Sequence, residues 1–359
     1  LYPVPYSDCI VTSGNSPALF RLGSALECCD LTQYGIEHEL LAQCFMPNIG
    51  GIIAVSYVES QFEFNLISPS VLDYSVIDGT EPAESMLTVN EYIAEDYWFA
   101  VNGSSLPENL QGVRSRADEI SEKYGVRILL SSQCLPACTF AEYPTTTTDQ
   151  MDLADEAASI NAALDSLEEA LSLYPEGFFP QFRSEFGDGG IRIMLVGGFE
   201  SNFNMIGYSV QNSLWHNIYV DIFSEGLVGT YCHEIWHATE DHITSINYGE
   251  FDVVQWAELN PDGFQYIFDP AESILNEGDY TYFGSTKPKD CYFIDGYAKT
   301  NEREDRARIM EYAMTGFFGS ELSEYPHLYA KLRYMSDKIR QYFDTTGWST
   351  PRWEDALGE

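Results

Sequence analysis

The sequence predicts a protein of the α+β class that is built from two parts. Residues 1–105 contain β-rich runs separated by turn signals, whereas from about residue 110 amphipathic helical patterns alternate with short apolar strands. The length of 359 residues fits two domains. We therefore expect a strand-rich or mixed N-terminal module at 1–105 and a larger domain at 106–359 with a mixed sheet packed on helices.

The N-terminal module shows its clearest pattern in two neighbouring runs, GIIAVSYV at 51–58 and QFEFNLI at 61–67. Both runs are rich in β-branched and aromatic residues, and the short gap between them predicts a hairpin. Asp-Gly at 78–79 and Asn-Gly at 102–103 are turn signals. No motif in this module carries chemistry, so the sequence assigns no role to it.

The second part begins with a helical pattern at 113–124, which Gly125 ends. Thr147 and Gln150 have the spacing of a capping box, which predicts a helix from about 149 to 173. Apolar runs and helical periodicity predict the remaining elements. These are strands at 126–130, 191–196 and 217–223 and a packing helix at 325–343.

The charge of the chain excludes several classes of partner. The sequence has 18 basic and 56 acidic side chains, a formal net charge of −38, and Arg21 is the only basic residue among residues 1–110. Phosphate backbones and anionic membranes attract Lys/Arg clusters, so we expect no nucleic-acid partner. No apolar run is long enough to cross a membrane, so we expect no transmembrane span. A hydrophobic content of 45% argues against disorder.

The cysteines favour an oxidising compartment. The chain has 8 cysteines, among them the adjacent pair Cys28 and Cys29 and the closely spaced Cys134 and Cys138. Reduced buried thiols remain an alternative, and a zinc site at Cys134 and Cys138 is disfavoured because no second pair has ligand spacing. The first residues, Leu-Tyr-Pro, lack Met and a signal segment, which indicates a removed leader or a trimmed sequence. We expect an extracytoplasmic protein.

The motif that carries chemistry is HEIWH, from His233 to His237. It lies in a helix that we expect to begin near Gly226 with Ser224 as its cap. Residues four apart share one helical face, so both imidazoles can bind one zinc ion, and Glu234 lies one step around the helix, where a carboxylate can take a proton from water. The alternative is a pair of ordinary core histidines.

A catalytic zinc needs a third protein ligand. The metzincin pattern fails because Glu240 and Ile243 stand where Gly and His are required. His242 lies on the opposite face of a continuous helix from His233, so it is a poor ligand. The better candidates are the carboxylates in the first turn of a second helix at 301–312, although acids there also suit the helix dipole without any ligand role.

The sequence HEIWHATED from His233, followed by Gly-Tyr ending at Tyr297 and by EDRA from Glu304, resembles the gluzincin metallopeptidases. Within them it is most similar to the anthrax lethal factor and Pro-Pro endopeptidase group. In that group the third zinc ligand is a helical Glu followed three residues later by Ala, and a Tyr seven residues before it stabilises the oxyanion. Glu304 matches at both spacings, and the specific motifs cover about 215–316.

This resemblance implies a zincin-like domain in which the two helices meet below a cleft. The implied cofactor is zinc, and its implied ligands are His233, His237 and Glu304. Glu234 is then the general base and Tyr297 the oxyanion donor. The resemblance also extends to uncharacterised zinc-peptidase-like lipoproteins and secreted proteins of gut bacteria, which implies a secreted protein or one lipid-anchored at the bacterial cell surface.

The chain departs from the pattern at Arg308, where such families often carry a second acid four residues after the ligand. Asp305 or Asp241 is then expected to support the ligands instead.

Several other residues have competing interpretations. Tyr280, Tyr282 and Tyr292 are alternatives to Tyr297. His216 precedes the strand at 217–223 and could touch substrate, but a structural role is favoured. Cys232 adjoins His233, and we expect it to be buried packing.

The predicted function is a zinc-dependent endopeptidase acting on a peptide or protein substrate. One alternative is an extracytoplasmic peptide- or protein-binding protein on an inactive zinc-peptidase scaffold. A second is a purely structural zinc site, which would leave Glu234 without a role.

Overall fold

The structure is a computed structural model. It describes residues 10–11, 40–46, 51–58, 61–67, 106–134, 143–183, 189–200, 205–212, 215–247, 251, 253–275, 282–284, 290–319 and 321–358. The chain divides into two compact units, one of Leu1–Pro107 with Ser132–Phe140 and the other of Glu108–Ser131 with Ala141–Glu359. Its combination of helices and sheets agrees with the predicted α+β class. The turns at 78–79 and 102–103 and the cysteines 28, 29 and 138 lie outside the described residues.

The first unit contains a four-stranded antiparallel sheet in the order β1-β2-β3-β4. Its strands are β1 (Ile10–Val11), β2 (Leu40–Met46), β3 (Gly51–Val58) and β4 (Gln61–Ile67). Val58 pairs with Gln61, so β3 and β4 form the hairpin that the sequence predicts.

The second unit is organised around a mixed sheet in the order β5-β7-β10-β9. The strands are β5 (Arg127–Leu130), β7 (Gly190–Val196), β9 (Gly207–Asn212) and β10 (Trp215–Asp221). The first three strands in this order are parallel, and β9 pairs antiparallel with β10 at the edge. Ile128, Ile193 and Ile218 are in register across the parallel strands, and all three are buried.

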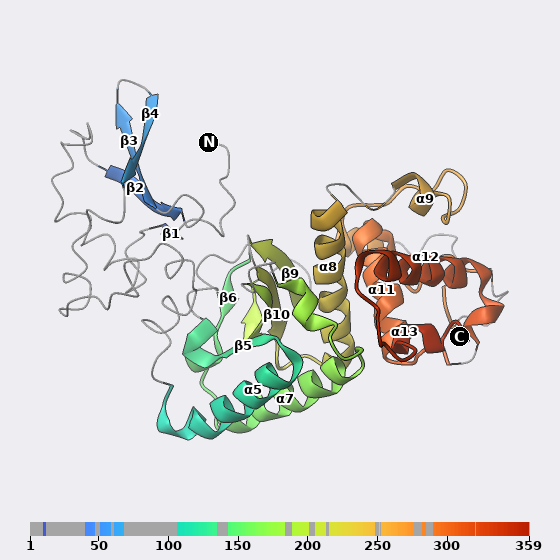
Figure 1. Cartoon of the computed structure of the whole chain (residues 1–359), viewed down its shortest axis with the longest axis horizontal. Coiled ribbons are helices and arrows are strands. Elements are labelled where there is room, and N and C mark those ends of the chain that lie inside the picture. Colours follow the sequence, from blue (N-terminus) through green and yellow to red (C-terminus); the bar gives the residue numbers. More distant parts are fainter. Residues whose placement is uncertain are drawn as a thin grey trace. The chain divides into compact units, whose positions relative to one another are not determined.

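Helices α5 (Gln111–Tyr124) and α7 (Glu156–Ser172) come before strand β7 in the chain and lie side by side (Figure 1). Gly125 ends α5 in the left-handed conformation at φ +76°, as the sequence predicts. A two-stranded sheet of β6 (Thr145–Thr146) and β8 (Gly198–Phe199) contacts strand β10.

The predicted start of the second helix is wrong by seven residues. The capping box of Thr147 and Gln150 is present, but it begins only one 3-10 turn at Thr148–Gln150, and Met151 is extended. The helix α7 begins at Glu156, where the Asp155 side chain accepts a hydrogen bond from the Ala158 backbone at 3.0 Å.

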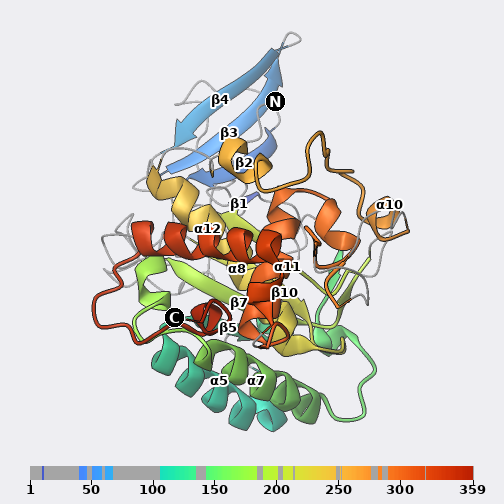
Figure 2. The same cartoon turned by 90° about the vertical axis from the view of Figure 1, so that its right-hand side faces the viewer.

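The central helix α8 (Leu227–Asn247) contacts β9, β10 and α7 and, on its other side, α11 (Glu302–Met314) and α12 (Pro326–Tyr342). Figure 2 shows α12 beside α8 and α11. Ser224 does not have the predicted capping role, because α8 begins at Leu227 and Gly226 precedes it, and the Ser224 hydroxyl donates to Asp221 at 3.2 Å. The remaining helices are the short α9 (Val253–Ala257), α10 (Pro270–Leu275) and α13 (Arg352–Asp355).

Buried ion pairs hold the helices around α11. Arg306 donates to the Glu240 carboxylate of α8 at 3.0 Å, and Lys331 of α12 donates to Asp305 at 2.6 Å. All four side chains are almost completely buried. These pairs fix α11 against its two neighbours, although a buried pair is weak evidence for net stability.

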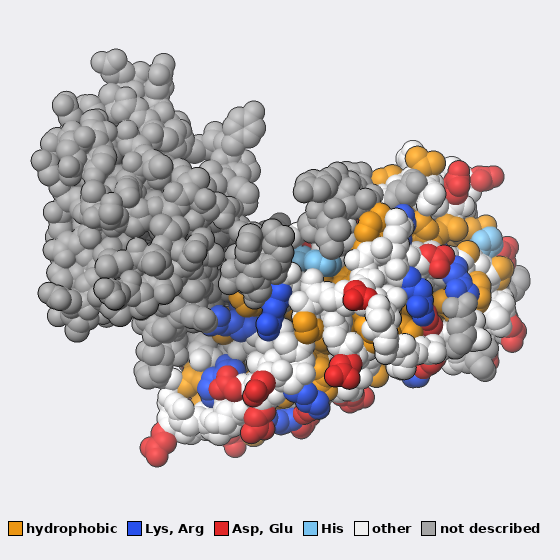
Figure 3. Space-filling model, in the orientation of Figure 1, with side chains coloured by type: hydrophobic (Ala, Val, Ile, Leu, Met, Phe, Trp, Pro, Cys, Tyr) orange, Lys and Arg blue, Asp and Glu red, His pale blue; other side chains and the backbone are white. Residues whose placement is uncertain are grey.

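Oppositely charged side chains lie next to each other on the described surface. On the face shown in Figure 3 many Lys and Arg side chains lie beside Asp and Glu side chains. Arg116 and Lys123 of α5, for example, pair with Asp165 and Glu168 of α7 at 2.5 and 2.8 Å. None of the helices in the described part of the chain combines the length and hydropathy that crossing a membrane requires.

Candidate metal centre and cleft

Helix α8 presents both histidines of the HEIWH motif on one face. Gly226 precedes the helix with φ +73°, and the Thr230 backbone donates to its carbonyl at 3.2 Å. His233 and His237 are one turn apart, and their ring centroids are separated by 4.9 Å. Both imidazoles are buried. The helical spacing therefore brings two nitrogen donors together, as the sequence predicts.

Glu304 approaches these histidines from α11. Asn301 caps this helix, and its side chain accepts hydrogen bonds from the backbones of Arg303 and Glu304 at 2.9 and 3.0 Å. Glu304 therefore lies in the first turn of α11, where its carboxylate is directed at the face of α8 that carries the histidines. His233, His237 and Glu304 form one compact group of possible metal ligands.

The donor atoms of this group form a small triangle. His233 Nε2 lies 3.0 Å from Glu304 Oε2 and 3.2 Å from His237 Nε2, and the third side measures 3.6 Å. Tetrahedral zinc with ligands at 2.0–2.1 Å requires donor separations of about 3.3 Å. The three residues therefore fit a zinc ion without rearrangement of the helices.

The triangle is electrostatically polarised. Burial would lower the pKa of His233, but hydrogen bonds to Glu304 and Glu311 outweigh it and raise the pKa to about 10. Burial would raise the pKa of Glu304, but the two histidines hold it well below its usual range. The group therefore favours an ionised carboxylate with a positive charge beside it, and either a proton or a metal cation provides that charge.

Glu234 projects into the space beside the triangle and is only 4% exposed. Among the described residues, its Oε2 atom has no hydrogen-bond partner. Burial raises the pKa of Glu234 above its ordinary value, although the nearby histidines pull it in the opposite direction. A buried carboxylate with a raised pKa and one oxygen without a hydrogen-bond partner among the described residues suits a proton acceptor that must later release the proton.

Tyr297 also lies near His233, in the short 3-10 helix η10 (Tyr297–Lys299). Its ring centroid is 6.3 Å from that of His233. Burial, followed by the charges of Glu304 and Glu234, raises the pKa of the phenol, so it remains a hydrogen-bond donor. Tyr282 and Tyr292 do not line the same space, since Tyr282 lies under Lys299 and Tyr292 stacks on His327. Tyr280 lies outside the described residues.

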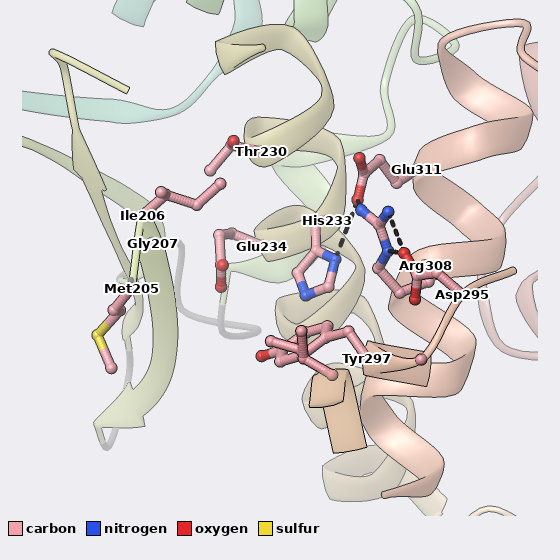
Figure 4. A pocket seen from close by; sticks show the side chains of 12 residues that line it. Met205, Ile206, Gly207, Thr230, His233, Glu234, Asp295, Tyr297, Arg308 and Glu311 are labelled. Carbon is pink, nitrogen blue, oxygen red and sulfur yellow. Dashed lines mark hydrogen bonds and ion pairs between the residues drawn. The ribbon is translucent and has the colours of Figure 1, made fainter. Parts of the chain in front are cut away.

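Two hollows of about 450 and 610 Å³ meet at this group. The residues that line both are Met205, Gly207, His233, Glu234 and Tyr297. Figure 4 shows the first hollow, with the Glu234 carboxylate beside the His233 imidazole and the Tyr297 ring below it. The edge strand β9 forms one wall of the second hollow. A cleft therefore extends in two directions from the candidate metal position.

Glu311, which the sequence analysis does not identify, contacts the candidate ligand His233 at Nδ1, the ring nitrogen away from Glu304. Its Oε2 atom lies 3.3 Å from His233 Nδ1. The two acids that were expected there have other partners, since Asp305 accepts from Lys331 and Tyr266, and Asp241 accepts from Arg303. Glu311 follows Glu304 by seven residues, which is two helical turns, so the spacing itself could have identified it.

Three other residues from the sequence analysis lie outside the cleft. His242 and His216 pack near each other, with ring centroids 5.9 Å apart, and neither belongs to the ligand group. His216 lies within β10 instead of before it. Cys232 is buried, and burial raises the pKa of its thiol. His216 and Cys232 are therefore buried, in line with the structural and packing roles that the sequence favours, and His242 is outside the ligand group.

Comparison with known proteins assigns neither a family nor a function to the chain. No protein-family model matches the chain, and neither a curated protein nor a solved structure matches it.

Proposed function

We propose that this protein is a zinc-dependent endopeptidase of the gluzincin type. The observation that carries the proposal is the triangle of His233, His237 and Glu304 donors, with Glu234 and Tyr297 in the same cleft. The resemblance of the motif residues to the lethal factor and Pro-Pro endopeptidase group supports the same assignment. It also supports an extracytoplasmic location, either secreted or lipid-anchored at a bacterial cell surface.

The composition of the ligand group supports a catalytic zinc over a structural one. Structural zinc sites usually have four protein ligands, whereas catalytic sites have three and an open position. Among the described residues the group contains two imidazoles and one carboxylate, with no fourth His, Cys, Asp or Glu. Two nitrogen donors and one carboxylate match the His₂Glu set of zinc peptidases.

A bound zinc ion supplies Lewis acidity, which activates water and polarises a carbonyl group. Glu234 takes a proton from water as the water oxygen forms a bond to the carbonyl carbon of the substrate. The Tyr297 hydroxyl donates a hydrogen bond to the carbonyl oxygen as its negative charge develops. Glu234 then passes its proton to the departing amine as the C–N bond breaks, which returns the carboxylate to its starting state.

The cleft supports cleavage within a chain. A substrate that passes the ligand group can extend into both hollows, because both share His233, Glu234 and Tyr297. The strand β9 is at the edge of its sheet and lines the larger hollow with residues Gly207 to Gln211. An extended peptide can add to such an edge through main-chain hydrogen bonds.

A binding protein without turnover is the second candidate. The sequence favours it at Arg308, where an acid that supports a zinc ligand is expected. In the structure Glu311 contacts His233 in that way, which weakens this argument.

The direct experiment compares the parent with Glu234→Gln for zinc content and for cleavage of a pool of quenched fluorescent peptides. The variant keeps the shape of the side chain and all three zinc ligands but cannot accept a proton. We expect bound zinc in both proteins and a loss of cleavage of about 10²–10⁴-fold in the variant. Glu225→Gln is the matched control, since Glu225 is exposed just before α8 and should leave cleavage unchanged.

Three outcomes are informative. A parent without bound zinc, or equal cleavage by parent and Glu234→Gln, contradicts the proposal. A parent that binds zinc and peptides but cleaves none of them supports the binding protein instead.

A further inference from the structure

Arg308 occupies the position on α11 where the related families often carry an acid, and its guanidinium contacts two carboxylates. Its Nε and Nη2 atoms donate to Asp295 Oδ2 at 2.9 and 2.5 Å, and its Nη1 atom donates to Glu311 Oε2. The side chain is 19% exposed, so solvent weakens these charged hydrogen bonds only in part. One arginine therefore bridges two acids in the wall of the smaller hollow (Figure 4).

Each of the two acids also contacts a part of the candidate site. The Glu311 oxygen that Arg308 holds is also 3.3 Å from His233 Nδ1. The other oxygen of Asp295 accepts a hydrogen bond from the Ala298 backbone at 3.0 Å, within the 3-10 turn that carries Tyr297. The connections therefore run from His233 through Glu311, Arg308 and Asp295 to the Tyr297 turn.

The packing around Glu311 supports a specific position for its carboxylate. A Cβ atom at Gly229 would lie 3.0 Å from Glu311 Oε1 and 3.4 Å from its Cγ atom. Gly229 is on α8, one turn before His233, so the bare backbone leaves the space into which the carboxylate fits. Gly229 and Glu311 are far apart in sequence, and together they allow the Glu311 carboxylate to lie against the Nδ1 side of His233.

We propose that Arg308 is a positioning residue that orients His233 through Glu311 and the Tyr297 turn through Asp295. This inference rests on the proposed function, because it takes His233 as a zinc ligand and Tyr297 as the oxyanion donor. A carboxylate at Nδ1 fixes the tautomer of the imidazole. The Nε2 lone pair then faces the candidate metal position, which Glu304 and His237 also border. Such a contact also makes the ligand more basic, which strengthens metal binding.

The two arms can be separated by substitutions that each remove one charge. Glu311→Gln removes the charge behind His233, Asp295→Asn removes the charge beside the Tyr297 turn, and Arg308→Gln releases both acids. Zinc affinity is measured for the full-length proteins by competition with a chromophoric chelator. Arg340→Gln is the control, since Arg340 makes two hydrogen bonds to Glu354 on α13 and lines neither hollow.

For the His233 arm, we expect Glu311→Gln and Arg308→Gln each to weaken zinc binding by about 10–100-fold. The double variant should be no weaker than the weaker single variant, because both changes disrupt the same connection. Arg340→Gln should match the parent. Zinc affinity of Arg308→Gln within twofold of the parent, or fully additive losses in the double variant, would overturn the inference.

For the Tyr297 arm, the readout is cleavage of whichever peptide the parent cleaves fastest. We expect Asp295→Asn to lower kcat at least tenfold while KM and zinc affinity stay within twofold of the parent. A structural defect alone would not produce this split. Equal kcat in Asp295→Asn and the parent would remove the Tyr297 arm. A parent that binds no zinc would instead overturn the proposed function and this inference together.

Discussion

A Cβ atom at Gly207 would lie 3.0 Å from a carboxylate oxygen of Glu234. The same atom would be 3.1 Å from both the Thr230 methyl group and the Tyr219 carbonyl oxygen. Gly207 begins β9 and faces the turn of α8 that carries Glu234. The missing side chain at this position therefore provides the space in which the proposed general base lies.

We predict that Gly207→Ala lowers cleavage about tenfold or more while zinc binding is retained, because the added methyl group displaces Glu234 and not the ligands. Rates and zinc content of the purified variant measure this. Gly112→Ala is the control, because nothing lies within 4 Å of a Cβ atom there. That control should keep full activity and gain about 0.5–1 kcal/mol of stability in its helix. Unchanged cleavage by Gly207→Ala would argue against Glu234 as the base.

Tyr297→Phe tests the assignment of the oxyanion donor. Removal of one such donor typically costs 10²–10³ in kcat, and we expect a loss of about that size here. Zinc affinity should stay close to that of the parent, because the hydroxyl is not a ligand in the proposal. Tyr292→Phe serves for comparison, since Tyr292 stacks on His327 outside both hollows. If the two variants had equal kcat values, another group would have to stabilise the oxyanion.

The buried pair of Glu240 and Arg306 joins the two helices that carry the proposed zinc ligands. Glu240→Ala leaves the Arg306 guanidinium buried between the rings of Phe251 and Trp256 without its carboxylate. We predict a loss of about 3–5 kcal/mol in the free energy of unfolding, measured with urea. Asp118→Ala removes an exposed pair with Arg114 and should cost less than about 1 kcal/mol. Similar losses in the two variants would show that the buried pair has no special role.

His216 predicts a pH dependence of stability. Burial, and to a lesser degree the neighbouring His242, lowers the pKa of His216 to about 3. In the unfolded chain the group titrates near 6.5, so below that pH the unfolded state binds a proton that the folded state does not. The stability associated with neutral His216 is therefore complete above pH 6.5 and is lost as the pH falls toward 3.

Replacing His216 by Leu should make the pH dependence shallower by up to about 1.4 kcal/mol per pH unit between pH 6 and 4. Urea unfolding at several pH values measures the slope. Ile218→Val is the comparison, because it removes a buried methylene from the same strand without changing a titratable group. An identical slope in His216→Leu and the parent would show that His216 does not contribute to acid sensitivity.

The elements that the sequence predicts well are those with strong local signals. Gly125 ends its helix, and the alternating run at 61–67 forms the hairpin with its neighbour, because such features depend on adjacent residues only. The start of α7 was misplaced because the capping box at Thr147 is genuine but is followed by an extended residue. A second cap, Asp155, then begins the long helix, and local signals alone do not rank the two.

The candidate site is predictable to different degrees. The face shared by His233 and His237 follows from helical geometry. Glu304 is 71 residues from His233, so its approach depends on how α11 packs against α8, and the sequence indicates it only through a family resemblance. The family's spacing of four residues points to position 308 and so does not identify Glu311. Arg308 stands where the family pattern has an acid, and in the structure it donates a hydrogen bond to Glu311, which contacts His233.

The central claim is that one zinc ion binds between α8 and α11. The most direct measurement is a crystal structure of the protein with anomalous data collected on both sides of the zinc absorption edge. We predict a single strong peak within about 2.0–2.2 Å of His233 Nε2, His237 Nε2 and a Glu304 oxygen. A zinc-saturated crystal with no peak at these atoms, or with its peak at other residues, would contradict it.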